Sequence, residues 1–331
     1  MSQKKLMDDL KKKNFSPCYL LYGEESFLVA HYANTIEKAV FPDGVDPLFR
    51  DVFEEKTPAY DITMAAETVP FLAEKKMVLV KNSGLFESGR KDDSAAIAEY
   101  LPKIPDTTVV VFTESKADKR SKLFKEISKY GTVVECTPPT PNDLSTWVTR
   151  TCKEKGKQIS PSTANFLVRF VGSNMWALVN EIGKVAAFAG EEITVKDIEA
   201  ICTPTLESRI FDLTKAMFKG QTSIALDKYH DMLRLKESPI GILTMIIRQF
   251  RIALIAKGAK KSGMTIGQTA VEFKLHDFAV SEALEFSNKF TEDELVDALQ
   301  ECLELDVKMK TGLIEPELGA ELLIVRYGRL S

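Results

Sequence analysis

The chain is 331 residues long, with 44% hydrophobic residues, 28% charged residues and a formal net charge of −4. This length predicts two or three domains, and the balanced composition excludes a disordered or fibrous protein. The slightly negative charge argues against a protein that coats nucleic acid through overall attraction.

The cysteines and the first residues of the chain point to a cytoplasmic protein. The five cysteines are far apart and form no CxxC pair, which favours free thiols in a reducing compartment. Residues 1–17 alternate lysine and aspartate with leucine, which predicts a short surface helix and not a signal peptide. The most apolar stretch, residues 240–255, is amphipathic and shorter than the ~20 residues that cross a bilayer. We therefore expect no membrane partner.

From residue 18 to about residue 137, short apolar runs alternate with helical segments. This alternation predicts a parallel sheet covered by helices, with strands buried on both faces. The expected strands are Cys18–Gly23, Leu48–Phe53, Lys76–Lys81, Thr107–Phe112 and Gly131–Cys136. The expected helices between them are Ser26–Val40, Asp61–Val69, Asp93–Leu101 and Lys122–Tyr130.

Two proline-containing breaks, Thr137–Pro141 and Thr203–Pro204, divide the rest of the chain, because proline fixes φ and removes a backbone donor. Beyond each break, apolar residues three and four apart predict helices. The helices expected after the first break are Asn142–Glu154, Pro161–Val171, Met175–Phe188 and Val195–Ile201. Those expected after the second are Arg209–Lys219, Ser223–Leu235, Pro239–Lys257, His276–Phe286, Glu292–Lys308 and Pro316–Tyr327. We predict an α/β domain at residues 1–138, a small helical domain at 139–205 and an all-helical domain at 206–331.

The first expected strand is followed by a glycine turn and a helix, where nucleotide-binding α/β proteins place their phosphate loop. A working loop, GxxxxGK[ST], needs a second glycine, a lysine for the phosphates and a hydroxyl for magnesium. Here Gly23 is followed by Glu24, Glu25 and Ser26, so two carboxylates would repel the phosphates. They suit the first turn of a helix, where the helix dipole favours negative charge. After the fourth strand, Glu114 alone is too little for a magnesium site. We predict a degenerate loop without bound nucleotide.

Other catalytic patterns are missing from the sequence. The histidines His31, His230 and His276 are far apart and lack neighbours at metal-ligand spacing. No GxSxG, HExxH or GxGxxG motif occurs. The basic stretch Lys116–Lys125 favours a solvated loop over a DNA-backbone contact. We expect no metal, no cofactor and no catalytic residues, while triads assembled from distant positions stay open.

Several stretches resemble bacterial DNA polymerase III delta subunits. They are YLLYGEESFLV, PFLAEKKMVLV, SRIFDLTKAMFKG, ESPIGILTMIIRQFRIAL and ELDVKMKTGLIEPELGAELLIVRY. Each motif is weak, but their order along the chain is specific. The resemblance implies a degenerate AAA+ (P-loop-like) core that binds no ATP, a small helical lid, and a helical collar that joins the other loader subunits in a ring. In the lid stretch Gly172–Ile182, the arginine that AAA+ lids direct to the nucleotide is missing.

The resemblance also implies a working surface. In that family, an apolar pair at the end of a helix in the first domain inserts into a hydrophobic pocket on the sliding clamp, the beta subunit. The matching positions here are Phe71 and Leu72, preceded by Val69 and Pro70. An exposed apolar tip with a charged rim suits an interface anchor. Without the resemblance, the favoured interpretation is a pair that covers the core beneath the third strand. Some members place leucine before phenylalanine, which leaves the share of each residue open.

The implied partners are the clamp, the delta prime and gamma/tau subunits through the collar, and primed DNA within the assembled loader. The expected role is a non-catalytic subunit of a DNA-directed DNA polymerase complex, which holds the clamp open for loading without hydrolysing ATP. Two alternatives stay open. One is an active AAA+ ATPase subunit of the same machine, against which the missing lysine argues. The other is a helical scaffold unrelated to replication.

Overall fold

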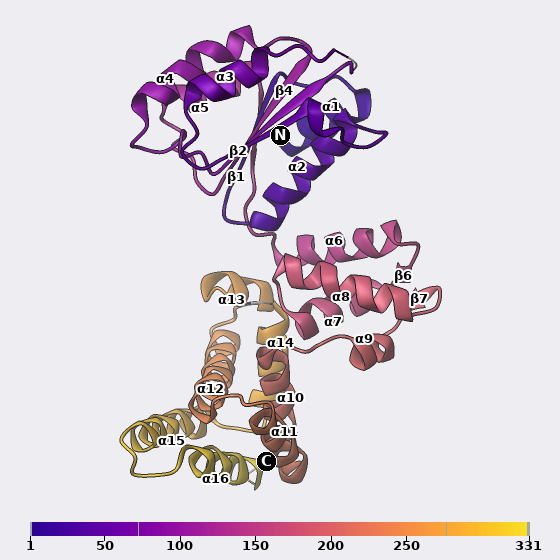
Figure 1. Ribbon diagram of the computed structural model, residues 1–331. Helices are drawn as coiled ribbons and strands as arrows, with labels where there is room; N and C mark the ends of the chain where they lie inside the picture. Colours follow the sequence, from indigo (N-terminus) through magenta and orange to yellow (C-terminus); the bar gives the residue numbers. More distant parts are fainter. Residues whose placement is uncertain (1, 72, 276, 330–331) are drawn as a thin grey trace. The chain divides into compact units, whose positions relative to one another are not determined.

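The computed structural model describes residues 2–71, 73–275 and 277–329, and the chain divides into two compact units between Pro139 and Thr140 (Figure 1). This division lies within the predicted proline-rich break. A further division of the second unit near residue 205 stays a prediction.

The first unit is built on five parallel strands in the order β2-β3-β4-β1-β5. They are β1 (Cys18–Tyr22), β2 (Arg50–Glu54), β3 (Lys76–Lys81), β4 (Thr108–Glu114) and β5 (Thr132–Glu135). Every residue of β1 and β4 is buried, as expected for central strands covered on both faces.

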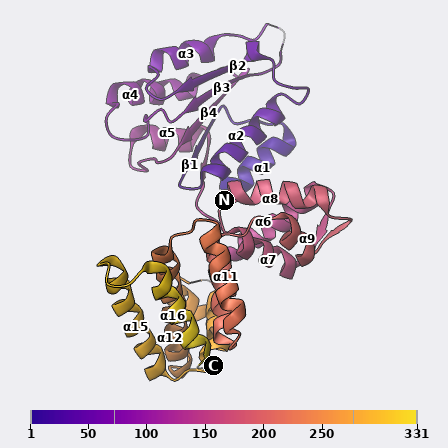
Figure 2. The same ribbon diagram turned by 60° about the horizontal axis from the view of Figure 1, so that its bottom comes forward.

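Helices cover both faces of this sheet. They are α1 (Ser2–Lys12), α2 (Ser26–Val40), α3 (Ala59–Glu67), α4 (Lys91–Tyr100) and α5 (Lys122–Tyr130), with short 3-10 turns η1 (Pro47–Phe49) and η2 (Leu101–Lys103). Figure 2 shows α3, α4 and α5 on one side of the strands and α1 and α2 on the other. Alternate residues of β1 supply the two cores, since Leu20 packs with α3, α4 and α5 while Leu21 packs with α1 and α2.

Because all five strands are parallel, they all begin on one side of the sheet and all end on the opposite side. We call the edge where the strands begin the amino edge, and the edge where they end the carboxyl edge. In open α/β sheets, ligands ordinarily bind outside the carboxyl ends of the strands.

The second unit is mostly helical. Its first part holds α6 (Pro141–Glu154), α7 (Pro161–Val171), α8 (Met175–Phe188) and α9 (Val195–Ile201), with the short parallel strands β6 (Gln158–Ile159) and β7 (Glu192–Ile193). The rest holds α10 (Leu206–Phe218), α11 (Thr222–Arg234), α12 (Pro239–Lys261), α13 (Ile266–Glu272), α14 (Asp277–Ser287), α15 (Glu292–Lys310) and α16 (Pro316–Arg329). One hydrophobic core joins these last helices.

Helix α12 alone among the described helices is long and apolar enough to cross a membrane, judged by length and composition. Its side chains Ile246, Phe250 and Ala253 are buried in the core shared by the surrounding helices. Phe250 stacks edge-on against Phe218 and Tyr327, with ring centroids 5.1 Å apart in both pairs. We therefore interpret α12 as the central helix of a helical bundle.

The predicted fold class, a helix-covered parallel sheet followed by helical segments, is confirmed. The sequence did not predict α13, β6 or β7, because segments of seven and two residues are too short to show a period. The second strand begins at Arg50, so the predicted start at Leu48 is wrong. The predicted start of the helix at His276 lies outside the described residues.

Candidate functional site

The turn after β1 lies at the carboxyl edge and packs tightly against the end of β5. Gly23 has φ +144°, and a Cβ atom at this position would lie 2.1 Å from the carbonyl oxygen of Cys136. Only glycine fits this combination of left-handed backbone and close contact. The turn thus uses its glycine to approach another strand of the protein.

The backbone N–H groups of this turn already donate within the chain. The N–H of Gly23 donates to the carbonyl of Glu114 at 3.2 Å, and the N–H of Glu25 donates to the carbonyl of Cys136 at 3.0 Å. The N–H of Ser26 donates to the carbonyl of Glu24, and the Glu25 carboxylate caps α2 by accepting from the N–H of Phe27 at 3.1 Å. A phosphate loop needs free N–H groups aimed at the anion. These four are committed to the protein.

Glu114 ends β4 at the same edge, and its side chain is also engaged. The residue is 3% exposed, and its carboxylate accepts from the N–H of Ser83 at 3.0 Å, the hydroxyl of Ser83, and the N–H of Gly84 at 3.4 Å. Burial raises the pKa of this carboxyl above its ordinary value. Glu114 therefore orders the turn after β3. Within residues 2–71, 73–275 and 277–329, no group of three or more histidine, cysteine or acidic residues could hold a metal ion.

The basic stretch Lys116–Lys125 lies beyond β4 and pairs with carboxylates nearby. Lys119 lies 2.8 Å from Glu135, and Arg120 lies 3.0 Å from Asp118. These exposed pairs match the predicted solvated loop.

The predicted interface residues lie at the opposite, amino edge, directly after α3. The helix ends at Glu67, because valine before proline disfavours a helical backbone at Val69. The buried hydroxyl of Thr108, the first residue of β4, donates to the carbonyl of Ala66 at 2.9 Å. The last turn of α3 is thereby fixed to a central strand.

Beyond this anchor the chain projects apolar side chains into solvent. Phe71 is 93% exposed and Val69 is 69% exposed, while Pro70 is half-buried. Leu72 lies outside the described residues. Phe71 does not cover the core beneath β3, which was the alternative interpretation. We call Val69, Pro70 and Phe71 the tip.

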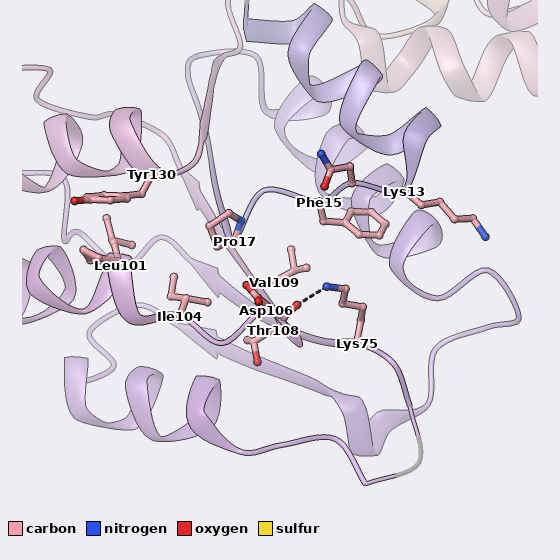
Figure 3. A pocket seen from close by; sticks show the side chains of 12 residues that line it. Lys13, Phe15, Pro17, Lys75, Leu101, Ile104, Asp106, Thr108, Val109 and Tyr130 are labelled. Atoms are coloured by element: carbon pink, nitrogen blue, oxygen red, sulfur yellow. Dashed lines mark hydrogen bonds between the residues drawn. The ribbon is translucent and has the colours of Figure 1, made fainter.

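The tip returns to β3 through charged residues that hold the base of the loop. The ammonium of Lys76 lies 2.7 Å from the carboxylate of Asp51 in β2. The ammonium of Lys75 donates to the backbone carbonyl of Asp106, and both residues line an open cleft of about 330 Å³ that also includes Lys13 and Phe15 (Figure 3). The loop that carries the tip is therefore fixed to the sheet at both ends.

Comparisons with known proteins match most of the chain. A family model described as DNA polymerase III, delta subunit matches residues 19–137, and a model of the C-terminal domain of the same family matches residues 207–327. A DNA polymerase III subunit delta of Bacillus subtilis (strain 168) is 29% identical over 327 residues, which cover 96% of this chain and 94% of that relative. The chain belongs to the DNA polymerase III delta subunit family.

More distant and structural relatives agree with this membership. A curated protein of Aquifex aeolicus (strain VF5) is 21% identical over 238 residues, 69% of this chain and 67% of the relative. The solved structure of the Bacillus subtilis DNA clamp loader delta protein has a TM-score of 0.63 and 28% identity, and the match covers 98% of this chain and 99% of that one. The predicted family is confirmed, and this delta subunit has its role in DNA replication.

The structure separates the two sets of predicted residues in this delta subunit. Gly23, Glu24, Glu25 and Ser26 lie at the carboxyl edge, and the tip lies at the amino edge. The sequence missed the exposure of Leu48, because it assigned that residue to a buried strand. The only signal was the preceding Asp46–Pro47 pair, which is typical of a turn.

Proposed function

We propose that this delta subunit binds the sliding clamp, the beta subunit of the polymerase, through the tip and the adjoining Leu72. The exposure of Phe71 on a loop fixed at both ends is the observation that carries the proposal. A large apolar side chain that no part of its own unit covers, bordered by charged residues, has the composition of an interface anchor.

The energetics suit a specific contact. Burying Phe71 and Leu72 on a partner contributes ~3–6 kcal/mol before ordering costs, from ~1.5–3 kcal/mol for each side chain. Because the loop is anchored beforehand, less ordering is required on binding. A subunit shifts a ring between closed and open forms only by binding one form more tightly. The tip would therefore hold a clamp shape that is incompatible with closure.

The proposed subunit is non-catalytic and neither binds nor hydrolyses ATP. The support comes from the carboxyl edge, where N–H groups that would hold phosphate donate to Glu114, Cys136, Glu24 and Glu25 instead. Nucleotide-driven partners would control when the tip is presented. No cofactor is required for this role.

Family membership supports the remaining partners of the proposal. The C-terminal helical part, residues 206–331, would serve as the collar that joins the delta prime and gamma/tau subunits. Residues 139–205 would form the lid. Primed DNA would be contacted within the assembled loader, in the cytoplasm. An exposed collar surface is available on α15, where Leu303 and Val307 face solvent one turn apart.

The decisive experiment is a double substitution in the full chain, Phe71→Ser with Leu72→Ser, with clamp affinity measured by surface plasmon resonance. We expect affinity to fall at least about 100-fold, which corresponds to about 2.7 kcal/mol. Thermal unfolding should be unchanged, because Phe71 lies outside the core.

The matched control is Tyr60→Ser, which removes a side chain that is 69% exposed at the other end of α3. It should leave clamp affinity within about twofold of the wild type. A folded double variant that binds the clamp as well as the wild type removes the proposed site.

A further inference from the structure

We propose that the clamp-binding surface has a second apolar contact beside the tip, made by Leu48 and Val45 at the η1 turn. This inference rests on the proposed function and extends it to residues of a different loop. We call Val45 and Leu48 the second contact.

Exposure first singles out this turn. Of the described residues in the first unit, Phe71 and Leu48 are the two most exposed large apolar side chains, at 93% and 79%. Val45 is also exposed, at 39%. A soluble protein leaves single apolar side chains exposed often, but two that gather at one edge call for an explanation.

The strand register brings the two loops to the same edge. Arg50, the first residue of β2, pairs with Met77 of β3 in parallel. Adjacent strands lie about 4.8 Å apart. Leu48 lies two residues before β2, and Phe71 lies five residues before β3. Both loops therefore enter neighbouring strands from the amino edge.

The η1 turn is held in place much as the tip is. The Asp46 carboxylate accepts from the N–H of Leu48 at 2.9 Å, and the Asp46 carbonyl accepts from the N–H of Phe49 at 3.0 Å. The Arg50 guanidinium lies 2.6 Å from the carboxylate of Glu37 in α2. A preformed turn presents Leu48 without a large ordering cost on binding.

The area of the tip alone is smaller than a stable interface buries. An aromatic side chain buries about 150–250 Å². A stable protein–protein interface needs about 800 Å² on each partner. The missing area must come from the surroundings of the tip, and the second contact provides exposed apolar surface at the same edge. Tyr60 is as exposed as Val69, yet it lies in the first turn of α3, the end of the helix nearer the carboxyl edge.

The occupant of this surface is the sliding clamp, since continuity with the tip assigns both loops to one partner. Charged residues border the two loops: Asp43, Asp46 and Glu74 are exposed acids, and Lys75 is the neighbouring base. An apolar surface with a mainly acidic rim fits an apolar pocket bordered by basic side chains. Clamp binding should accordingly weaken as the salt concentration rises.

The test compares Leu48→Ser, Phe71→Ser and Tyr60→Ser in the full chain, by clamp affinity and by thermal unfolding. We expect Leu48→Ser to weaken clamp binding about tenfold, which corresponds to about 1.4 kcal/mol, and Tyr60→Ser to change it less than about twofold. All three variants should unfold at the wild-type temperature, because the three side chains are exposed.

The outcomes separate this inference from the proposed function. If Phe71→Ser weakens binding and Leu48→Ser does not, the second contact is wrong and the tip stands. If neither variant weakens binding, the second contact is wrong and Phe71 is not the anchor that the proposed function requires. If Tyr60→Ser weakens binding as much as Leu48→Ser, the surface follows α3 and the second contact is again wrong.

Discussion

The carboxyl and amino edges of the same sheet differ in how they treat their polar and apolar groups. At the carboxyl edge, Gly23 packs against Cys136 and the acid Glu114 is buried with donors around it. At the amino edge, Phe71 and Leu48 project into solvent from loops anchored by hydrogen bonds and ion pairs. Such sheets ordinarily bind ligands at the carboxyl edge, but here the groups at that edge are bonded within the protein. The apolar side chains at the amino edge are exposed to solvent.

This contrast separates stability from binding within one unit. At the carboxyl edge, Gly23 and Glu114 contribute to folding, because a Cβ atom at Gly23 would clash with Cys136 and loss of the Glu114 carboxylate leaves its donors without an acceptor. The exposed side chains at the amino edge contribute little to folding, because no core residue depends on them. Substitutions at the carboxyl edge should therefore lower the free energy of unfolding, and substitutions at the amino edge should lower the affinity for the partner.

The largest expected effect on folding comes from Gly23→Ala. The new Cβ atom would meet the Cys136 carbonyl oxygen at 2.1 Å while the backbone keeps φ +144°, and the combined cost should exceed about 4 kcal/mol of unfolding free energy. Urea denaturation measures the loss.

The matched control for that substitution is Gly44→Ala. Gly44 also has a positive φ, +109°, but a Cβ atom there would meet nothing within 4 Å. Its cost should be limited to backbone strain, about 1–3 kcal/mol. Equal losses for both variants would show that close packing of the turn against β5 has no energetic role.

A smaller effect is expected from Glu114→Ala, which leaves the buried donors of Ser83 and the part-buried N–H of Gly84 without their acceptor. We expect a loss of about 2–4 kcal/mol in urea denaturation. Glu54→Ala, at the end of β2 with an exposed side chain, is the control and should cost less than about 0.5 kcal/mol.

The effect of Glu114→Ala should also depend on pH. Burial raises the folded-state pKa of Glu114 above 4.5, so the stability that it contributes is complete below that value and declines as the pH rises through the folded pKa. The difference between wild type and variant should thus be larger at pH 4.5 than at about pH 8. A difference that grows with pH contradicts this assignment.

The smallest expected effect is that of Mg·ATP on thermal unfolding, which should be none. A ligand that binds the native state raises its apparent stability, by about 2.7 kcal/mol at 100 times the dissociation constant. A clear rise in unfolding temperature at millimolar Mg·ATP would favour the alternative of an active ATPase subunit and reverse the contrast between the edges.

Local sequence patterns predicted the strands of the sheet better than the turns and loops at the strand ends. The apolar runs at Cys18–Tyr22 and Lys76–Lys81 identify strands because burial on both faces needs continuous apolar sequence. The carboxylates after Gly23 predicted a degenerate loop, but the contact with Cys136 could not be predicted, since it joins residues more than 100 positions apart. This contact exists only once β1 and β5 are paired in the sheet.

The amino edge was predicted only through the family resemblance. From residues alone, a core-covering position was the favoured interpretation of Phe71, and a short apolar pair has no measurable period that would show its exposure. Leu48 was assigned to a strand because it adjoins Phe49 and a β-prone run, and the Asp46–Pro47 pair was the one local signal of a turn there. Exposure is a property of the assembled sheet.

The hydrogen bond from Thr108 to the Ala66 carbonyl has a mechanical consequence. On the proposed function, any force that the clamp exerts on this subunit acts at the tip. Here that force would pass from the end of α3 into β4, which is flanked by β3 on one side and β1 on the other. A strand with two neighbours is harder to displace than a peripheral one, so the pull would be spread over the stiffest part of the unit.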